Sequence, residues 1–373
     1  MIGGGHGAFI GPIHRIAAAL HGQWQIVAGA LSSTPDKSLA SGRELLLAPD
    51  RNYPTWRDML AAESQRPPAD RIAAVSIVTP NSSHFEIALA CVHAGFHVIC
   101  DKPMVTTSDQ ASTLIDAVHK SGTLFAVTYN YTGYPMVKQA AAMVRAGELG
   151  DIRKVFIEYH QGWLATKLEE TGHKQASWRQ DAALAGAGGA ISDIGTHAEN
   201  LLSTVTGLTI ESLCADLTSF VSGRTLDDDA SVLMRFKGGA KAVLTATQIA
   251  IGEQNNLTLR VHGTTGSIAW KQEEPNTLTW HHSDGSTRIL SRAAAMLHPT
   301  AANSSLLPPG HPEGFLEAFA NIYRSVAAAI YAQRAGNASH TPDFPTIPDG
   351  ARSIRFVERV VESHRAGGKW LPF

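Results

Sequence analysis

Short apolar runs alternate with amphipathic stretches over the first 130 residues of the chain. Four runs rich in β-branched residues are expected strands, at 24–31, 72–78, 98–100 and 124–128. The segments around them have a helical pattern, at 12–20, 38–46, 83–94 and 108–121. Strands alternating with helices of about 10–15 residues predict a doubly wound parallel α/β sheet, which binds ligands at the carboxyl ends of its strands.

After about residue 150 the pattern changes to alternating apolar and polar positions, interrupted by turn residues. Lys237-Gly238-Gly239 and Asp284-Gly285 each separate two such runs, which is typical of β-hairpins. The expected strands are 155–161, 212–220, 231–236, 242–248, 257–262, 267–271, 278–282 and 287–290. This half is therefore expected to be an α+β domain with a large, mostly antiparallel, open sheet.

Two further helices are expected near the C-terminus, at 313–334 and 350–365. Asp349 is the expected N-cap of the second helix, and Gly367 stands just past its end. The expected loops, rich in Ala, Pro and Ser, are 293–311 and 335–348.

Length and composition narrow the class of protein. With 373 residues the chain is long for one core, so two domains are expected, 1–130 and 131–373. The formal net charge of -2 gives no reason to expect nucleic acid or a membrane surface as partner. Three cysteines, with neither a disulfide nor a zinc pattern, suit a reducing cytoplasm. No apolar run is long enough to span a membrane, and no secretory signal is evident, so a cytoplasmic location is expected.

The chain opens with a glycine-rich turn, in which Gly3, Gly5 and Ala8 fit the spacing G-x-G-x-x-A before a helix. Glycines allow a tight turn and let the backbone approach a pyrophosphate at the helix N-terminus. Only Met1 and Ile2 precede the glycines, whereas a strand usually has about five residues. Either this strand is short or the natural start lies upstream.

The adenosine ribose of a dinucleotide usually meets an acidic residue near the end of the second strand. Asp36 could bind the ribose hydroxyls of NAD. Alternatively, Ser32 and Ser33 with Arg43 could accept the 2′-phosphate of NADP. The sequence favours NAD and leaves NADP open.

Three further motifs follow the glycine turn: Thr79-Pro80-Asn81 with His84, Asp101-Lys102-Pro103, and GGAISDIGTH at 188–197. In this order they resemble the glucose–fructose oxidoreductase/inositol dehydrogenase (Gfo/Idh/MocA) family over nearly the whole chain. The segments YNYTGYPMV and HPEGFLEAFANIY are most similar to family members acting on cyclitols and anhydrosugars, such as inositol and levoglucosan dehydrogenases.

The resemblance implies an N-terminal Rossmann domain and a C-terminal substrate domain whose open sheet forms a homodimer or homotetramer. It implies Lys102, Asp193 and His197 as catalytic residues, with Asp101 in place of the family's glutamate. The implied cofactor residues, with the glycine turn and the adenosine end included, are Gly3, Gly5, Ala8, Phe9, Ile10, Ser32, Ser33, Asp36, Thr79, Pro80, Asn81, His84, Asp101 and Lys102.

Oxidation of a secondary alcohol needs a base for the proton and a positive group for the developing alkoxide. His197 suits the first task and Lys102 the second. If 193–205 is helical, Ile194, His197, Leu201 and Val205 share its inward face, and Asp193 is placed to cap it.

A polyol pocket needs polar groups for hydroxyls and aromatic faces for C–H surfaces. The candidate substrate residues, with the catalytic Asp193 and His197, are Tyr131, Trp163, Trp178, Arg179 and His311. We expect no metal: Asp227-Asp228-Asp229 is expected to form a solvated turn, although a cation site is conceivable there. His281 and His282 should face opposite sides of a strand, and Cys100 is expected to be a small buried residue.

The sequence therefore predicts a dehydrogenase that oxidises a ring hydroxyl of a sugar, cyclitol or anhydrosugar with NAD. Two alternatives stay open. A tightly held NAD could be used transiently in glycoside cleavage or sugar-to-sugar redox chemistry. The fold could also serve as a non-enzymatic dinucleotide or sugar sensor, although the set Lys102, Asp193 and His197 argues against it.

Overall fold

The computed structural model describes residues 1–179, 186–337 and 339–373, without the side chains of Lys174, Gln175 and Trp178. The chain forms two compact units. The first contains Met1–Tyr129 and Phe319–Ala351, and the second contains Asn130–Ala318 and Arg352–Phe373. The expected second domain, 131–373, included the segment 319–351, which the structure assigns to the first unit.

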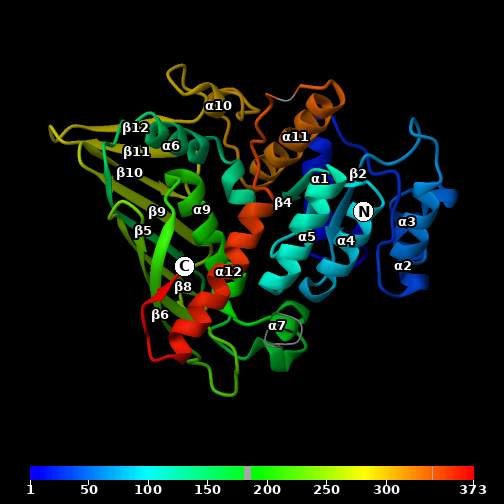
Figure 1. The fold of residues 1–373 in the computed structure, drawn as a ribbon, viewed down its shortest axis with the longest axis horizontal. Coiled ribbons are helices and arrows are strands. Elements are labelled where there is room, and N and C mark those ends of the chain that lie inside the picture. Colours follow the sequence, from blue (N-terminus) through cyan, green and yellow to red (C-terminus); the bar gives the residue numbers. More distant parts are fainter. Residues whose placement is uncertain (180–185, 338) are drawn as a thin grey trace. The chain divides into compact units, whose positions relative to one another are not determined.

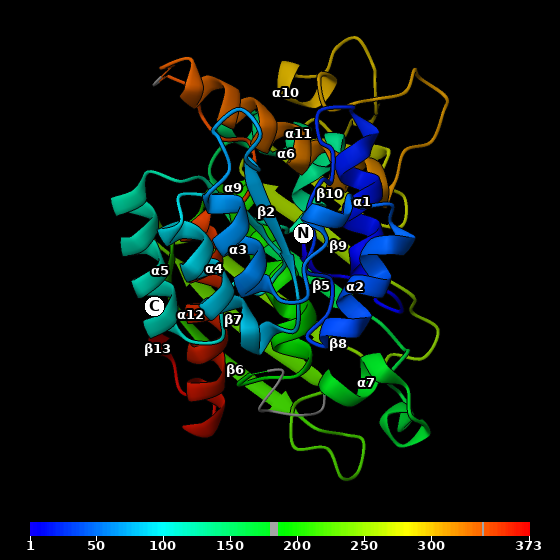
Figure 2. The ribbon, with the colours of Figure 1, turned by 90° about the vertical axis from the view of Figure 1, so that its right-hand side faces the viewer.

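The first unit is built on a parallel sheet with the strand order β1-β2-β3-β4. Strand β2 of this sheet is labelled in Figure 2. The strands are β1 (Ile2–Gly3), β2 (Ala74–Val78), β3 (His97–Cys100) and β4 (Phe125–Val127). All three pairings are parallel, which confirms the predicted Rossmann-like sheet.

The expected strand 24–31 is not continuous. Gly29 and Ala30 form only isolated parallel bridges, to Asn52 and Ile2. A ladder needs several consecutive partners, and the two-residue β1 offers too few for the rest of this segment.

The helices of the first unit confirm most of the sequence expectations. α4 packs against β2, β3 and α5, and α1 packs against β2. The sequence did not predict α3. The bounds are α1 (Ile10–Leu20), α2 (Pro35–Glu44), α3 (Trp56–Ser64), α4 (His84–His93) and α5 (Ser108–Ser121), with 3₁₀ turns at Pro49–Arg51 and Asn81–Ser83.

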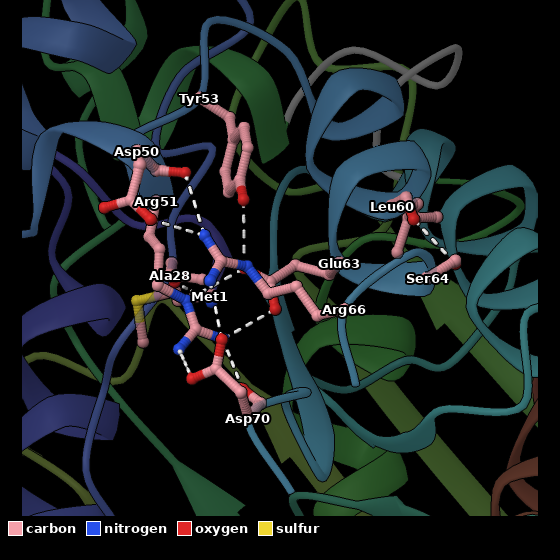
Figure 3. Close-up of polar contacts among 10 residues, drawn as sticks. All are labelled: Met1, Ala28, Asp50, Arg51, Tyr53, Leu60, Glu63, Ser64, Arg66 and Asp70. Carbon is pink, nitrogen blue, oxygen red and sulfur yellow. Dashed lines mark hydrogen bonds and ion pairs between the residues drawn. The ribbon is translucent and has the colours of Figure 1, made fainter. Parts of the chain in front are cut away.

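A cluster of charged side chains, here called the α3 cluster, fixes α3 to the segment before it (Figure 3). Glu63 is fully buried and accepts hydrogen bonds from Arg51 Nη2 at 2.6 Å and from the Tyr53 hydroxyl at 3.0 Å. Arg66 pairs with Asp70 at 2.6 Å, and it also pairs with Asp50 at the rim.

The second unit contains a nine-stranded sheet with the order β12-β11-β10-β9-β5-β8-β7-β6-β13 (Figure 1). Among its described strands, only β5 and β8 pair in parallel, which confirms the predicted mostly antiparallel sheet. The strands are β5 (Ile152–His160), β6 (Ile210–Thr218), β7 (Asp229–Phe236), β8 (Lys241–Thr247), β9 (Asn256–Gly263), β10 (Gly266–Lys271), β11 (Thr277–His282), β12 (Thr287–Ser291) and β13 (Leu371–Pro372).

One face of this sheet carries the apolar core, which it shares with α6, α9 and the second-unit part of α12. Burial alternates along β7, so the opposite face is exposed. The helices and short turns are α6 (Pro135–Arg145), α7 (Lys174–Arg179), α9 (Thr196–Thr206), α10 (Pro299–Ala302), α11 (Phe315–Arg334) and α12 (Ile347–Arg365), with 3₁₀ turns at Asn130–Gly133 and Leu168–Thr171 and a π turn at Ile191–Gly195.

Two expectations near the C-terminus are wrong. The expected loop 293–311 contains the short helix α10. Asp349 is not the N-cap of α12, because the helix begins two residues earlier at Ile347. Its carboxylate instead reaches back and accepts from the backbone N–H and hydroxyl of Thr346, at 2.7 and 2.9 Å.

Within the described ranges, no helix combines the length and apolar character needed to cross a membrane.

Candidate active site

The glycine-rich turn has the geometry of a pyrophosphate cradle. Gly3, Gly4 and Gly7 have φ of +80°, +72° and +75°, which side chains disfavour. A Cβ on Gly11 would lie 2.2 Å from the carbonyl oxygen of Gly4, so α1 can approach the turn only through this glycine. The motif spacing alone does not assign roles to Gly4 and Gly11.

The start of α1 is suited to an anion. Helix α1 begins at Ile10, directly after the turn, and no described side chain caps its first N–H groups. Phe9 and Gly7 are exposed, and Ala8 is half-buried. Free N–H groups at a helix N-terminus bind phosphate well, so the residues present fit the pyrophosphate of a dinucleotide.

The adenosine end keeps both sequence alternatives. Ser33, Asp36 and Arg43 are exposed, and Asp36 lies in the first turn of α2. Ser32 is half-buried, and its hydroxyl accepts from the N–H of Thr34 at 3.2 Å.

His84 connects two of the sequence motifs. Its ring is fully buried, with Nδ1 2.8 Å from the carbonyl oxygen of Pro103 and Nε2 2.8 Å from that of Thr79. These contacts tie the loop after β2 to the loop after β3. His84 therefore supports the loops from within, whereas the half-buried Asn81 is accessible to a ligand.

Asp101 and Lys102 follow directly after β3. The Asp101 Oδ1 atom accepts from the N–H of Lys102 at 2.9 Å and from the hydroxyl of Thr128 at 2.8 Å. The shortened acidic side chain is thus held between its own loop and Thr128, which follows β4. Lys102 is half-buried.

A buried histidine lies below this loop. The Nδ1 atom of His14 is 2.8 Å from the hydroxyl of Tyr323, and its Nε2 atom is 4.0 Å from Asp101 Oδ1. Burial lowers the pKa of His14 to about 4, so its imidazole is neutral near pH 7. The sequence motifs alone assign no role to His14 or Tyr323.

In the second unit, the signature segment 188–197 forms a π turn that continues into α9. Asp193 lies inside the π turn, so the prediction that it caps the helix is wrong. His197 is the second residue of α9 and is 8% exposed. The predicted inward stripe is confirmed, because Ile194, Leu201 and Val205 are also buried. π turns inside helices occur frequently at functional sites.

Asp193 is held by two donors on one oxygen. Arg179 Nε donates to Asp193 Oδ2 at 2.8 Å, and Gln248 Nε2 donates to the same atom at 2.9 Å. The guanidinium of Arg179 lies 5.6 Å from the ring centre of Trp163. The structure thus brings together three of the predicted residues, and it adds Gln248, which the sequence analysis missed.

Two buried tyrosines form the wall beside His197. The ring of Tyr131 meets the imidazole edge-on at 4.8 Å, and that of Tyr159 lies at 6.2 Å. Tyr159 donates to Asn255 Oδ1 at 2.6 Å and Asn255 Nδ2 donates to Tyr131 at 3.3 Å, so Tyr131 donates to Tyr159. Burial raises the pKa of both phenols, which therefore stay protonated. The ring of Tyr131 therefore packs against His197, while its hydroxyl proton is directed at Tyr159.

Two other predicted pocket residues are not placed with this cluster. His311 is exposed, and its carbonyl oxygen accepts from Arg292, which is itself paired with the buried Glu313 at 2.7 Å. The side chain of Trp178 lies outside the described residues.

The run Asp227-Asp228-Asp229 does not form a solvated turn. Asp227 is 8% exposed and Asp228 is fully buried, because their carboxylates accept backbone N–H groups. In the part of the chain that the structure describes, no group of three or more His, Cys, Asp or Glu side chains could hold a metal. Cys100 is buried, which raises the pKa of its thiol well above the usual value.

Two family models match most of the chain. Residues 1–129 match an oxidoreductase family with an NAD-binding Rossmann fold, and residues 137–269 match the GFO/IDH/MocA C-terminal domain. The chain belongs to the Gfo/Idh/MocA family of oxidoreductases. This confirms the resemblance that the motifs suggested.

Individual relatives cover the whole chain or most of it. The uncharacterized oxidoreductase YfiI of Bacillus subtilis is 34% identical, over 100% of this chain and 96% of its own. The levoglucosan dehydrogenase of Pseudarthrobacter phenanthrenivorans is 28% identical, over 74% of each chain. A crystal structure of an inositol dehydrogenase homolog from Azotobacter vinelandii with NAD+ has a TM-score of 0.96 and 35% identity, covering 100% and 96% of the two chains. A second structure of that homolog, with NADH and myo-inositol, has a TM-score of 0.93.

The protein is therefore an NAD-binding oxidoreductase, with its dinucleotide domain in the first unit.

Proposed function

We propose that the protein oxidises a secondary ring hydroxyl of an uncharged polyol, a cyclitol or an anhydrosugar, to a ketone. The observation that carries this proposal is the Asp193 cluster, defined as Asp193, Arg179, Gln248 and Trp163. It joins a carboxylate, an amide and an aromatic face, and His197 follows Asp193 by one turn. Hydroxyl groups need such donors and acceptors, and sugar C–H surfaces pack on aromatic rings.

The proposed roles follow from what each side chain can do. His197 removes the hydroxyl proton, a task that suits an imidazole near neutral pH. Lys102, in the first unit, supplies a positive charge that favours the substrate alkoxide. When NAD is bound, its nicotinamide ring supplies the hydride acceptor.

Asp193 binds a substrate hydroxyl in this proposal. Arg179 and Gln248 both donate to its Oδ2 atom, which fixes the orientation of the carboxylate that accepts the hydroxyl. Tyr131 holds the imidazole of His197 in a fixed orientation by packing its ring edge against it. The named relatives support the substrate class, since one was solved with myo-inositol and another is a levoglucosan dehydrogenase.

The test is nicotinamide reduction, followed by absorbance, with NAD or NADP and a panel of cyclitols, aldoses and anhydrosugars. We expect turnover with NAD and a narrow set of polyols. His197→Ala should lower kcat by about 100-fold or more, since general bases contribute about 10²–10⁴, while the Kd for NADH stays unchanged. Near-normal turnover in His197→Ala would remove this residue from the mechanism.

The same assay separates the alternatives. Product formation without release of NADH would indicate a tightly held cofactor that is used transiently. Tight polyol binding without turnover across the panel would indicate a sensor.

We also propose that the protein works in the cytoplasm as a homo-oligomer formed through the exposed sheet face. Leu233 on β7 and Ile289 on β12 are 46% and 68% exposed, which supports a partner surface, and the three cysteines are free. Sedimentation velocity measures the oligomeric state, and a monomer at micromolar concentration would contradict the proposal.

A further inference from the structure

Asp227 accepts hydrogen bonds from three consecutive backbone N–H groups at the start of the signature segment. Its Oδ1 atom accepts from Gly189 at 2.6 Å, and its Oδ2 atom accepts from Ile191 at 2.8 Å. Its own carbonyl oxygen accepts from the N–H of Ala190 at 2.8 Å. Because these N–H groups begin the helical turn, they have no partners within it, and a carboxylate satisfies them well.

The two glycines of the motif are explained by this contact. A Cβ on Gly189 would lie 2.1 Å from the carbonyl oxygen of Asp227, which is an impossible distance. A Cβ on Gly188 would lie 3.2 Å from Asp227 Oδ1 and 2.5 Å from the side chain of Ile191. The pair Gly188-Gly189 therefore leaves room for Asp227 to reach the backbone.

These hydrogen bonds hold the π turn that contains Asp193 and leads to His197. Asp193 follows Ile191 by two residues in the π turn, and its N–H donates to the carbonyl of Gly189 at 2.9 Å. His197 follows one turn later. A shift of the first turn would move both side chains together, and displacements of about 1 Å can cost about 100-fold in rate.

We propose that Asp227 is a positioning residue for catalysis: its carboxylate fixes the π turn and so sets where Asp193 and His197 lie. This inference rests on the proposed dehydrogenase function. Asp227 needs no contact with substrate or cofactor, and it is only 8% exposed.

The neighbouring acid offers a matched control. Asp228 is fully buried and accepts from the N–H groups of Phe220 and Val221, at 2.8 and 3.0 Å. It also lies 3.4 Å from Arg224. Its carboxylate thus caps the turn that contains Phe220 and Val221, which carries none of the proposed site residues.

The experiment compares Asp227→Asn with Asp228→Asn in the full-length protein. Both changes should lower Tm. Asp227→Asn should lower kcat about tenfold and leave the Kd for NADH unchanged, whereas Asp228→Asn should keep kcat within about twofold. Hydrogen exchange should become faster at 189–193 in the first variant and at 220–221 in the second.

An equal loss of kcat in both variants would overturn the proposal, because Asp227 would then act only through stability. Unchanged exchange at 189–193 in Asp227→Asn would also overturn it. If Asp227→Asn does not fold, Asp227→Ser keeps one uncharged capping oxygen and should give an intermediate kcat. If the wild-type protein turns over no polyol, the proposed function fails, while the exchange measurement still decides whether Asp227 fixes the turn.

Discussion

Each unit of the molecule contains a cluster of paired charges, and the two clusters differ in the exposure of their carboxylates. In the α3 cluster, Glu63 is fully buried, and both oxygens are engaged by Arg51, with Tyr53 added on one of them (Figure 3). In the Asp193 cluster, the Asp193 side chain is 14% exposed, and Arg179 and Gln248 donate to its Oδ2 atom.

The difference teaches that charge density alone does not mark a functional site. A carboxylate whose oxygens are all satisfied inside the protein stabilises the fold and has nothing to bind with. A carboxylate that is held in place by donors and remains partly exposed is oriented for a ligand. The α3 cluster should therefore govern stability, and the Asp193 cluster should govern turnover.

Removal of Glu63 is the largest expected effect on stability. Glu63→Ala leaves Arg51, which is 11% exposed, without its buried partner, and breaking such a pair costs about 3–5 kcal/mol. The free energy of unfolding of the first unit, measured in urea, should fall by this amount. The control is Glu86→Ala, whose ion pair with Arg57 is exposed and should contribute less than about 1 kcal/mol. Equal effects of the two variants would remove the distinction between the clusters.

The sequence predicts the main elements of both units, but it predicts only part of the candidate site. The periodicity predicts the parallel sheet and nearly all strands of the second unit, and the signature motif predicts Asp193 and His197. Gln248, Asn255 and Asp227 carry no local signal, because each acquires its role only when β-strands bring distant segments together. Their partners Asp193, Tyr131 and Gly189 lie 55, 124 and 38 residues away along the chain.

Two misses have simple physical causes. Three consecutive aspartates suggest a turn that is exposed to solvent. Buried backbone N–H groups can satisfy the carboxylates equally well, as at Asp227 and Asp228. The segment 24–31 has the composition of a strand, yet pairing depends on its neighbour, and β1 is two residues long.

The buried His14 should make the stability of the first unit depend on pH. It faces the hydroxyls of Tyr323 and Ser76 and the carboxylate of Asp101, and it lies near His84 and Arg15. Its folded pKa of about 4 lies below the unfolded value of 6.5, so the unfolded state binds more protons in between. The contribution of His14 to the free energy of unfolding is therefore fully present above pH 6.5. It falls by about 3 kcal/mol as the pH drops to 4.

Chemical denaturation of wild type and His14→Asn at pH 7 and pH 4 checks this. The difference in free energy of unfolding between the two proteins should shift by about 3 kcal/mol in favour of the variant at the lower pH. The carboxylates common to both proteins cancel in this difference. A pH-independent difference would show that His14 does not titrate on unfolding. His14 would then contribute to stability independently of pH.

The smallest free-energy change, but the most informative one, is expected at Asp193. Asp193→Asn keeps the shape of the side chain and replaces one oxygen by an amide, which loses both the charge that pairs with Arg179 and an acceptor for substrate. We expect kcat/KM for the polyol to fall about 100-fold, or about 2.7 kcal/mol, with less than about 1 kcal/mol lost in unfolding. Glu158→Gln, which breaks the exposed pair with Arg260 in the same unit, should change neither quantity. If Asp193→Asn instead behaves like Glu63→Ala, losing stability and retaining turnover, then the Asp193 carboxylate does not bind substrate and both clusters are structural.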